Sequence, residues 1–157
     1  MGVRSVQRGS LRLARFFPFR LNRLAAAVSQ HLSVIYRRGF ALEIPEWRVI
    51  ATVGEDAGCT AQLVAHSTRM HKTRVSRAIA QLMRRGLIER VAGERDRREM
   101  HLRLTRAGAR MYAQLVPLAL ARERALLACM SAADRRALLR ALERLERFLA
   151  LREAPDA

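Results

Sequence analysis

A short stretch in the middle of the chain limits the fold most, because it carries a strand pattern. In MHLRLT, residues 100–105, Met100, Leu102 and Leu104 alternate with polar neighbours, as in a strand that is buried on one side. The segment LIERVA, residues 87–92, alternates more weakly and predicts a second strand. A charged run joins the two, so they are expected to form one β-hairpin in a mainly α protein.

Apolar residues at steps of three and four predict helices on both sides of this hairpin. The first helix carries one apolar stripe, and the sequence RRG at 37–39 is expected to end it. The first four expected helices run from Pro18 to Gly39, from Pro45 to about Gly54, from the N-cap Thr60 to Ser67, and from Lys72 to Gly86. Two more are expected, from the N-cap Thr105 to Met130 and from the N-cap Ser131 to Leu151. Pro117 is expected to kink the long helix that follows Thr105.

The charge of the chain predicts a polyanionic partner. Its 157 residues include 30 Lys and Arg against 14 Asp and Glu, which gives a formal net charge of +16. A surplus of this size is typical of nucleic-acid binding and less often of binding to an acidic membrane surface. Lys72 is the only lysine, and the guanidinium groups of the many arginines suit phosphate and guanine edges.

The helix expected at residues 72–86 has the pattern of a DNA recognition helix. Val75 and Leu82 lie on a predicted buried side, whereas the opposite side carries small residues and arginines, and the segment has no acidic residue. A solvated helix normally mixes both signs of charge. An exposed basic helix without a partner is the alternative, but the short helix just before it completes a helix-turn-helix. The helix residues expected to contact DNA are Lys72, Thr73, Arg74, Ser76, Arg77 and Arg84.

The tip of the hairpin is predicted to contact DNA as well. It follows the candidate recognition helix directly, which is the arrangement of a winged helix. An arginine at such a tip can enter the minor groove, and Asp96 is expected to orient Arg98 through a charge-assisted hydrogen bond. The expected contact residues at the tip are Arg95, Asp96, Arg97 and Arg98.

These segments resemble the MarR family of transcriptional regulators. The pattern Asp96-x-Arg98-x-x-x-Leu102-x-Leu104-Thr105, followed by Gly108, is similar to that family's wing signature. TAQLVAHSTRMHKTRVSRAIAQLMRRGLIER looks like its helix-turn-helix, and IPEWRVIATV looks like its second helix. The resemblance covers about residues 16–150. His71 departs from it, because many relatives have Asp or Ser there, so a weaker cap on the recognition helix is expected.

The resemblance implies a winged helix-turn-helix domain flanked by long dimerisation helices. The expected organisation is a basic flexible arm at 1–15, an N-terminal dimerisation helix at 16–42, the DNA-binding domain at 43–105, C-terminal dimerisation helices at 106–152 and a tail at 153–157. The leucine stripes of the terminal helices independently call for a partner, since one small winged domain cannot cover them. A two-fold homodimer would read two half-sites about one helical turn apart.

The resemblance also implies release from DNA by a small, anionic and often aromatic ligand. The candidate ligand-binding residues are Arg20, His31, Tyr36, Trp47 and Arg48. The alternative role for Trp47 is packing in the core, and the alternative role for Arg20 is a surface or intersubunit salt bridge. The leading hypothesis is therefore a ligand-released repressor on a palindromic operator. A nonspecific or architectural nucleic-acid binder without a ligand switch is the second.

Other function classes find little support in the sequence. Cys59 and Cys129 are far apart in the sequence and do not have the spacing of metal ligands, which fits a reducing cytoplasm. A redox role for either cysteine is a weaker alternative. Cys129 is expected in the core or at the dimer interface. The histidines form no metal-like cluster, and no nucleophile with a base or phosphate-binding glycine loop is recognisable. No apolar run predicts a membrane span. We expect no cofactor, no metal, no enzymatic activity and a cytoplasmic location.

Overall fold

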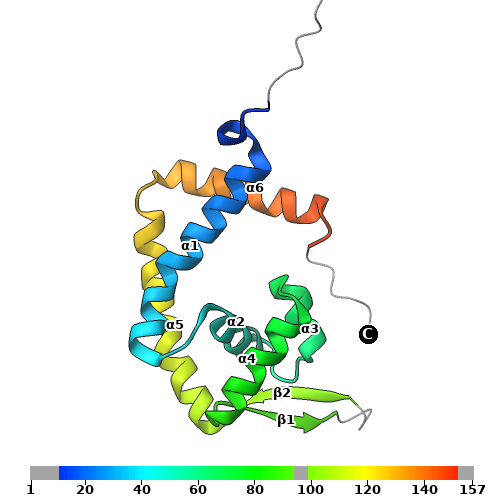
Figure 1. The fold of residues 1–157 in the computed structure, drawn as a ribbon. Coiled ribbons are helices and arrows are strands. Elements are labelled where there is room, and N and C mark those ends of the chain that lie inside the picture. Colours follow the sequence, from blue (N-terminus) through cyan, green and yellow to red (C-terminus); the bar gives the residue numbers. More distant parts are fainter. Residues whose placement is uncertain (1–10, 94–98, 152–157) are drawn as a thin grey trace, which may run out of the picture. The chain divides into compact units, whose positions relative to one another are not determined.

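The computed structural model describes residues 11–93 and 99–151 (Figure 1). In chain order the elements are η1 (Leu13–Arg15), α1 (Phe17–Phe40), α2 (Ile44–Glu55), α3 (Ala61–Thr68), α4 (Lys72–Arg84), β1 (Ile88–Ala92), β2 (Met100–Leu104), α5 (Arg106–Leu127) and α6 (Ala132–Phe148). The described strands form one two-stranded antiparallel sheet. The predicted fold class, mainly α with a small β wing, is confirmed.

The chain divides into two compact units, one ending at His31 and the other beginning at Leu32. The first unit contains η1 and the N-terminal part of α1. Most of its large apolar side chains are exposed, and the Arg23 guanidinium lies 5.7 Å from the centroid of the half-buried Phe19 ring. The second unit contains the remainder of α1 and all later elements.

The core of the second unit is built around α2. This helix packs against α3, α4, α5 and β2, so one element contacts four others (Figure 1). Burying a Val, Leu or Ile side chain contributes about 1.5–3 kcal/mol, which makes this core the main source of stability. Its fully buried large side chains are Leu42, Val49, Ile50, Val53, Val64, Val75, Ile79, Leu82, Leu102 and Leu115.

The second strand of the hairpin buries the side that the alternation predicts at its centre. Ile88 pairs with Leu104 and Ala92 pairs with Met100. Leu102 is fully buried, whereas Met100 is exposed at the outer end of β2, where the core no longer covers the strand. An isolated bridge between Thr60 and His101 extends the pairing towards α3.

The helix ends follow the predicted capping chemistry with one exception. The side chains of Thr60, Thr105 and Ser131 each accept a backbone hydrogen bond at 3.1 Å, which confirms them as N-caps. The expected stop at Gly39 is wrong: α1 continues to Phe40, and Ala41 has the positive φ of 51° instead. The Leu42 N–H donates to the Tyr36 carbonyl there, which turns the chain so that Leu42 enters the core.

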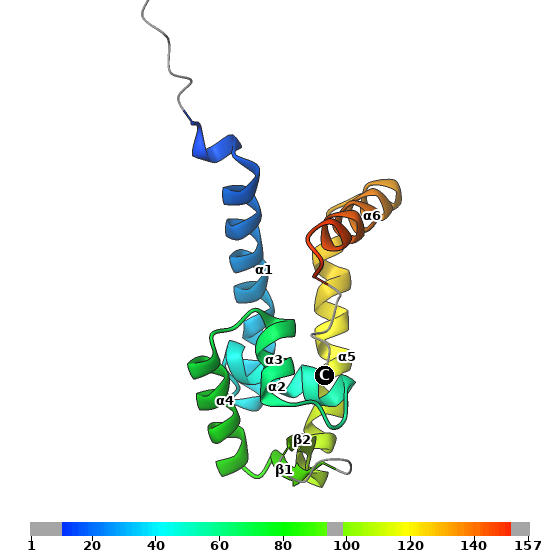
Figure 2. The ribbon, with the colours of Figure 1, turned by 90° about the vertical axis from the view of Figure 1, so that its right-hand side faces the viewer.

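The helix α6 is amphipathic but buries no residue. It begins at the far end of α5 from the hairpin (Figure 2). Leu138 is 37% exposed, Leu149 is 58% exposed and Phe148 is 84% exposed. Pro117 lies inside α5, which continues through it to Leu127.

Candidate nucleic-acid interface

The helix α4 separates its apolar and polar residues as predicted. Val75, Ala78, Ile79 and Leu82 are buried against the lobe. The six residues of α4 predicted to contact DNA are all exposed: Lys72, Thr73, Arg74, Ser76, Arg77 and Arg84. These side chains can contact a binding partner, because α4 packs against the core through its apolar side.

The N-terminal end of α4 is capped by an imidazole. The Nδ1 atom of His71 accepts a hydrogen bond from the Thr73 N–H at 3.3 Å. The bond is longer than the 3.1 Å of the hydroxyl cap on α3, in line with the expected weaker cap. A neutral ring nitrogen can accept this bond and a protonated one cannot. The end of the helix still presents backbone N–H groups, which favour an anion such as a phosphate.

The base of the wing is hydrogen-bonded to the loop between α2 and α3. The Leu102 N–H donates to the Cys59 carbonyl at 2.8 Å, and the Gly58 N–H donates to the Leu102 carbonyl at 3.2 Å. The His101 ring contacts the Gly58 carbonyl through Nδ1 and the Glu99 carboxylate through Nε2. These contacts fix β2 against the helix-turn-helix.

The predicted contact residues at the wing tip, Arg95 to Arg98, lie outside the described residues. The described part of the hairpin closes with the Gly93 N–H donating to the Glu99 carbonyl at 2.8 Å. The proposed pairing of Asp96 with Arg98 therefore stays a prediction.

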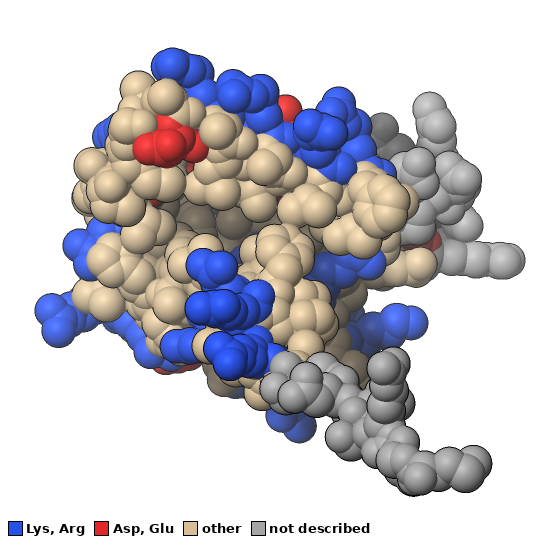
Figure 3. All heavy atoms as spheres, turned by 90° about the horizontal axis from the view of Figure 1, so that it is seen from above, with Lys and Arg blue, Asp and Glu red and all other residues tan. Residues whose placement is uncertain are grey.

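Positive charge dominates the described surface. On the face drawn in Figure 3, Lys and Arg side chains predominate over Asp and Glu side chains. Within the described residues, Arg74, Arg77 and Arg84 form no ion pair with a carboxylate. Their charge is thus available to a polyanion.

Three of the five predicted ligand residues lie together. The rings of Tyr36 and Trp47 stack with centroids 5.7 Å apart, and Arg48 is close enough to act on the Tyr36 hydroxyl. Burial raises the pKa of Tyr36, and the charges of Arg37 and Arg48 oppose that rise. Trp47 is half-buried and packs against the core. Arg20 and His31 belong to the first unit.

The two cysteines lie in different surroundings. Burial, with the nearby Asp56 carboxylate, raises the pKa of the Cys59 thiol from 9.0 to about 11. Cys129 is exposed at the turn between α5 and α6, so it does not lie in the core of the single chain. An interface role for Cys129 stays a prediction.

We expect Cys59 to resist thiol reagents while the protein is folded. A pKa shift of two units lowers the thiolate fraction at pH 8 about 100-fold, and the thiolate is the reactive form. In a Cys129→Ser variant, a chromogenic disulfide should therefore label Cys59 at pH 8 at least about 100-fold more slowly in the folded protein in buffer than in the protein unfolded in guanidinium chloride. Similar rates in the two solvents would contradict the buried, protonated state.

Sequence reasoning missed one arginine of the second unit. The Arg85 side chain, at the end of α4, donates to the backbone carbonyls of Phe40 and Ala41. Its basic neighbours made it look like one more surface arginine. Its partners lie 44 and 45 residues away, so no local spacing signals the contact.

Comparisons with known proteins agree with this arrangement. The model of the MarR family matches residues 42–99. A search among curated proteins finds no significant match. Among solved structures, a MarR/EmrR family transcriptional regulator from Acinetobacter sp. ADP1 is similar at 25% identity with a TM-score of 0.80, covering 89% of this chain and 99% of that one.

Two further structures share the fold at lower identity. A putative MarR family regulator from Listeria monocytogenes, solved with a 26mer DNA, has 18% identity and a TM-score of 0.76, covering 87% of this chain and 90% of that one. BpsR from Bordetella bronchiseptica has 19% identity and a TM-score of 0.75, covering 88% of this chain and 98% of that one.

The fold and the exposed basic helix define a winged helix-turn-helix protein. The family model and the similar structures narrow this class: residues 42–99 match the MarR family, and the chain has the fold of MarR-family transcriptional regulators. In the part of the chain that the structure describes, no helix is both long and apolar enough to cross a membrane. The same residues contain no group of three or more His, Cys, Asp or Glu side chains that could hold a metal ion.

Proposed function

We propose that the protein is a sequence-specific DNA-binding transcriptional regulator that acts as a homodimer on a palindromic operator. The exposed face of α4 carries the proposal, because it combines small residues with arginines that form no ion pair within the described residues, and α4 contains no carboxylate. Such a helix fits a major groove, where arginine forks bind guanine edges and phosphates. The protein would work by binding and release as a cytoplasmic repressor and not as an enzyme. The Listeria relative, crystallised with DNA, supports this reading.

The homodimer is supported by the apolar surface of α6. Its exposed leucines cost free energy in water, and a helix with this pattern normally buries its apolar side. A second copy of the chain would bury them and would place two α4 helices side by side on one operator. The exposed apolar residues of the first unit, among them Leu24 and Phe17, would add to such an interface.

A small anionic aromatic effector is proposed to release the DNA. In the similar protein BpsR, 6-hydroxynicotinic acid regulates DNA binding. In this chain the half-buried Trp47, stacked on the buried Tyr36, offers an aromatic surface, and Arg48 offers a cation for a carboxylate. Arg20 and His31 stay candidates for the same role. A thermal-shift screen of aromatic acids, followed by a DNA-release assay for each hit, tests the proposal.

The second candidate function is nonspecific binding through charge alone. The net charge of +16 favours it. It predicts an affinity that falls steeply with salt but hardly changes with sequence. Competition of an enriched duplex with random DNA at moderate salt separates the two candidates.

We expect Arg77→Ala and Arg74→Ala to weaken recognition of an operator. If the side chain contacts a base, the variant should lose about 1–3 kcal/mol of discrimination at that base pair. A duplex enriched from a random library by the full chain serves as the operator, and gel-shift titration at fixed salt gives the affinity. Arg136→Ala, which removes an exposed positive charge from α6, is the control and should keep the discrimination. Full discrimination by both α4 variants would remove these residues from the proposed interface.

A further inference from the structure

The turn between α1 and α2 is held by an arginine from a distant part of the chain. The Arg85 guanidinium donates one hydrogen bond to the Ala41 carbonyl at 2.8 Å and another to the Phe40 carbonyl at 2.7 Å. The last carbonyls of a helix have no partner within the helix, and they carry the negative end of its dipole. A planar cation with two parallel donors therefore suits this position better than a neutral side chain.

The same arginine marks the end of α4. Its backbone N–H donates to the Gln81 carbonyl, and the N–H of the next residue, Gly86, donates to the Met83 carbonyl. Gly86 has a φ of 64° that turns the chain into β1. Arg85 thus joins the C-terminal end of the candidate recognition helix to the C-terminal end of α1. The last carbonyls of α1 are thus capped by a side chain from the end of α4.

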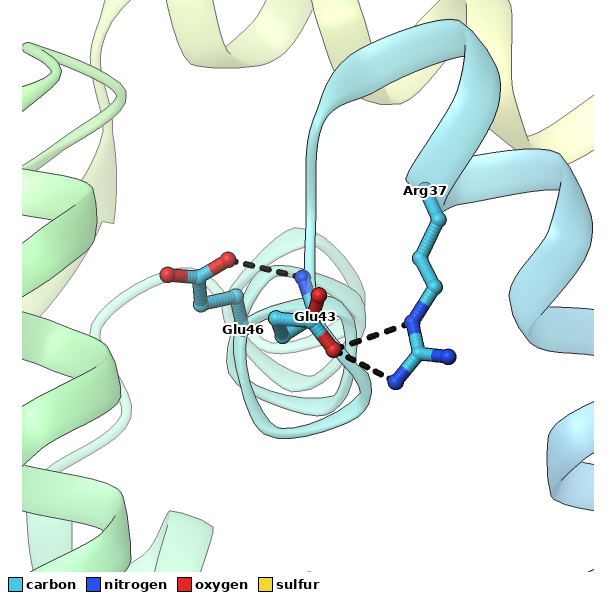
Figure 4. Close-up of polar contacts among 3 residues, drawn as sticks. All are labelled: Arg37, Glu43 and Glu46. Carbon is cyan, nitrogen blue, oxygen red and sulfur yellow. Dashed lines mark hydrogen bonds and ion pairs between the residues drawn. The ribbon is translucent and has the colours of Figure 1, made fainter.

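A second arginine holds the turn from the side of α1. Arg37 forms hydrogen bonds of 2.9 and 2.6 Å with the Glu43 carboxylate, and the Glu43 N–H donates to the Glu46 carboxylate at 2.8 Å (Figure 4). Leu42 lies between these contacts and is fully buried. The turn is therefore fixed by its backbone, by its charged side chains and by the core.

We propose that Arg85 is a positioning residue for operator binding, one that couples the recognition helix to the end of α1. The inference rests on the proposed function, in which α1 belongs to the dimer interface and two α4 helices read half-sites at a fixed spacing. With Arg85 in place, α4 and the end of α1 move as one body. Without it, α4 keeps its buried face but loses this direct hydrogen-bonded link to the end of α1, and the spacing between the two recognition helices varies more.

The test compares Arg85→Ala with its neighbour Arg84→Ala on DNA of altered spacing. The probes are the duplex enriched by the full chain and two derivatives with one base pair added or removed between the half-sites. One base pair rotates a half-site by about 34°, since B-DNA has about 10.5 base pairs per turn. Wild type should prefer the original spacing. Arg85→Ala should bind that duplex about tenfold more weakly, as expected for losing a charged hydrogen-bond pair, and should discriminate less between spacings.

The neighbour variant separates positioning from direct contact. Arg84→Ala should lower the salt dependence of binding by about one ion, as expected for a phosphate contact, and keep the preference for spacing. Arg85→Lys, which keeps the charge but not the fork, should restore part of the preference. If Arg85→Ala instead lowers affinity equally for all three duplexes and lowers the salt dependence by about one, Arg85 is a phosphate contact and the inference fails.

A distance measurement tests the coupling without DNA. In a Cys129→Ser background, a spin label on an introduced Gln81→Cys reports the separation of the two α4 helices in the dimer; Cys59 is buried and Gln81 is exposed. The distance distribution should be broader in Arg85→Ala than in wild type, and equal widths would overturn the inference. A wild type that is monomeric or shows no sequence preference would overturn the proposed function, and this inference with it.

Discussion

Replacing Gly108 with alanine is expected to destabilise the fold by about 3 kcal/mol or more. A Cβ atom at this position would lie 1.9 Å from the Leu87 carbonyl oxygen and 2.9 Å from its carbon. These are backbone atoms, so no side-chain rotation relieves the overlap. Thr105 fixes the approach, because its hydroxyl donates to the Gly86 carbonyl at 2.6 Å and accepts from the Gly108 N–H at 3.1 Å. The start of α5 would have to move away from β1.

Gly39→Ala is the matched control for this substitution. Gly39 lies inside α1, and nothing comes within 4 Å of a Cβ built there. Alanine should leave stability unchanged or raise it by about 0.5–1 kcal/mol, because it restricts the unfolded chain. Urea unfolding of both variants at one protein concentration gives the comparison, since the melting of a dimer depends on concentration. A Gly108→Ala variant as stable as wild type would show that α5 does not approach Leu87 so closely.

Charging the apolar side of α6 is expected to remove operator binding. In the double variant Leu138→Glu and Leu149→Glu, two carboxylates replace side chains that are exposed in the single chain and are proposed to be buried in the dimer. Burying unpaired charges is costly, so the dimer should dissociate at micromolar concentration. Losing the second half-site of a bivalent contact should then lower operator affinity about 10²–10⁴-fold. Light scattering gives the mass, and gel-shift titration gives the affinity.

The control for this variant is Arg140→Glu. It changes the charge of each chain by the same two units, and it lies on the side of α6 opposite to the leucine stripe. It should keep the dimer and most of the affinity. If both variants stay dimeric, the apolar side of α6 is not part of the interface. If wild type itself is monomeric, the proposed homodimer is wrong.

The sequence alone determined the features that depend on neighbouring residues. Alternation predicted the hairpin, hydroxyl side chains predicted the N-caps at Thr60, Thr105 and Ser131, and a 3.6-residue period predicted the buried side of α4. These signals are local because each records hydrogen bonding or burial within one element. They were sufficient for the fold class and for predicting that six residues of α4 are exposed.

Only the tertiary structure decided how the elements meet. Gly39 was expected to end α1, but the chain turns at Ala41, where Arg85 binds the free carbonyls and Leu42 enters the core. Gly108 appeared only as part of a motif, whereas the structure shows that it allows α5 to approach Leu87. The physical reason is that such contacts join atoms far apart along the chain. Their distances depend on how the helices pack, and no local period or spacing encodes that packing.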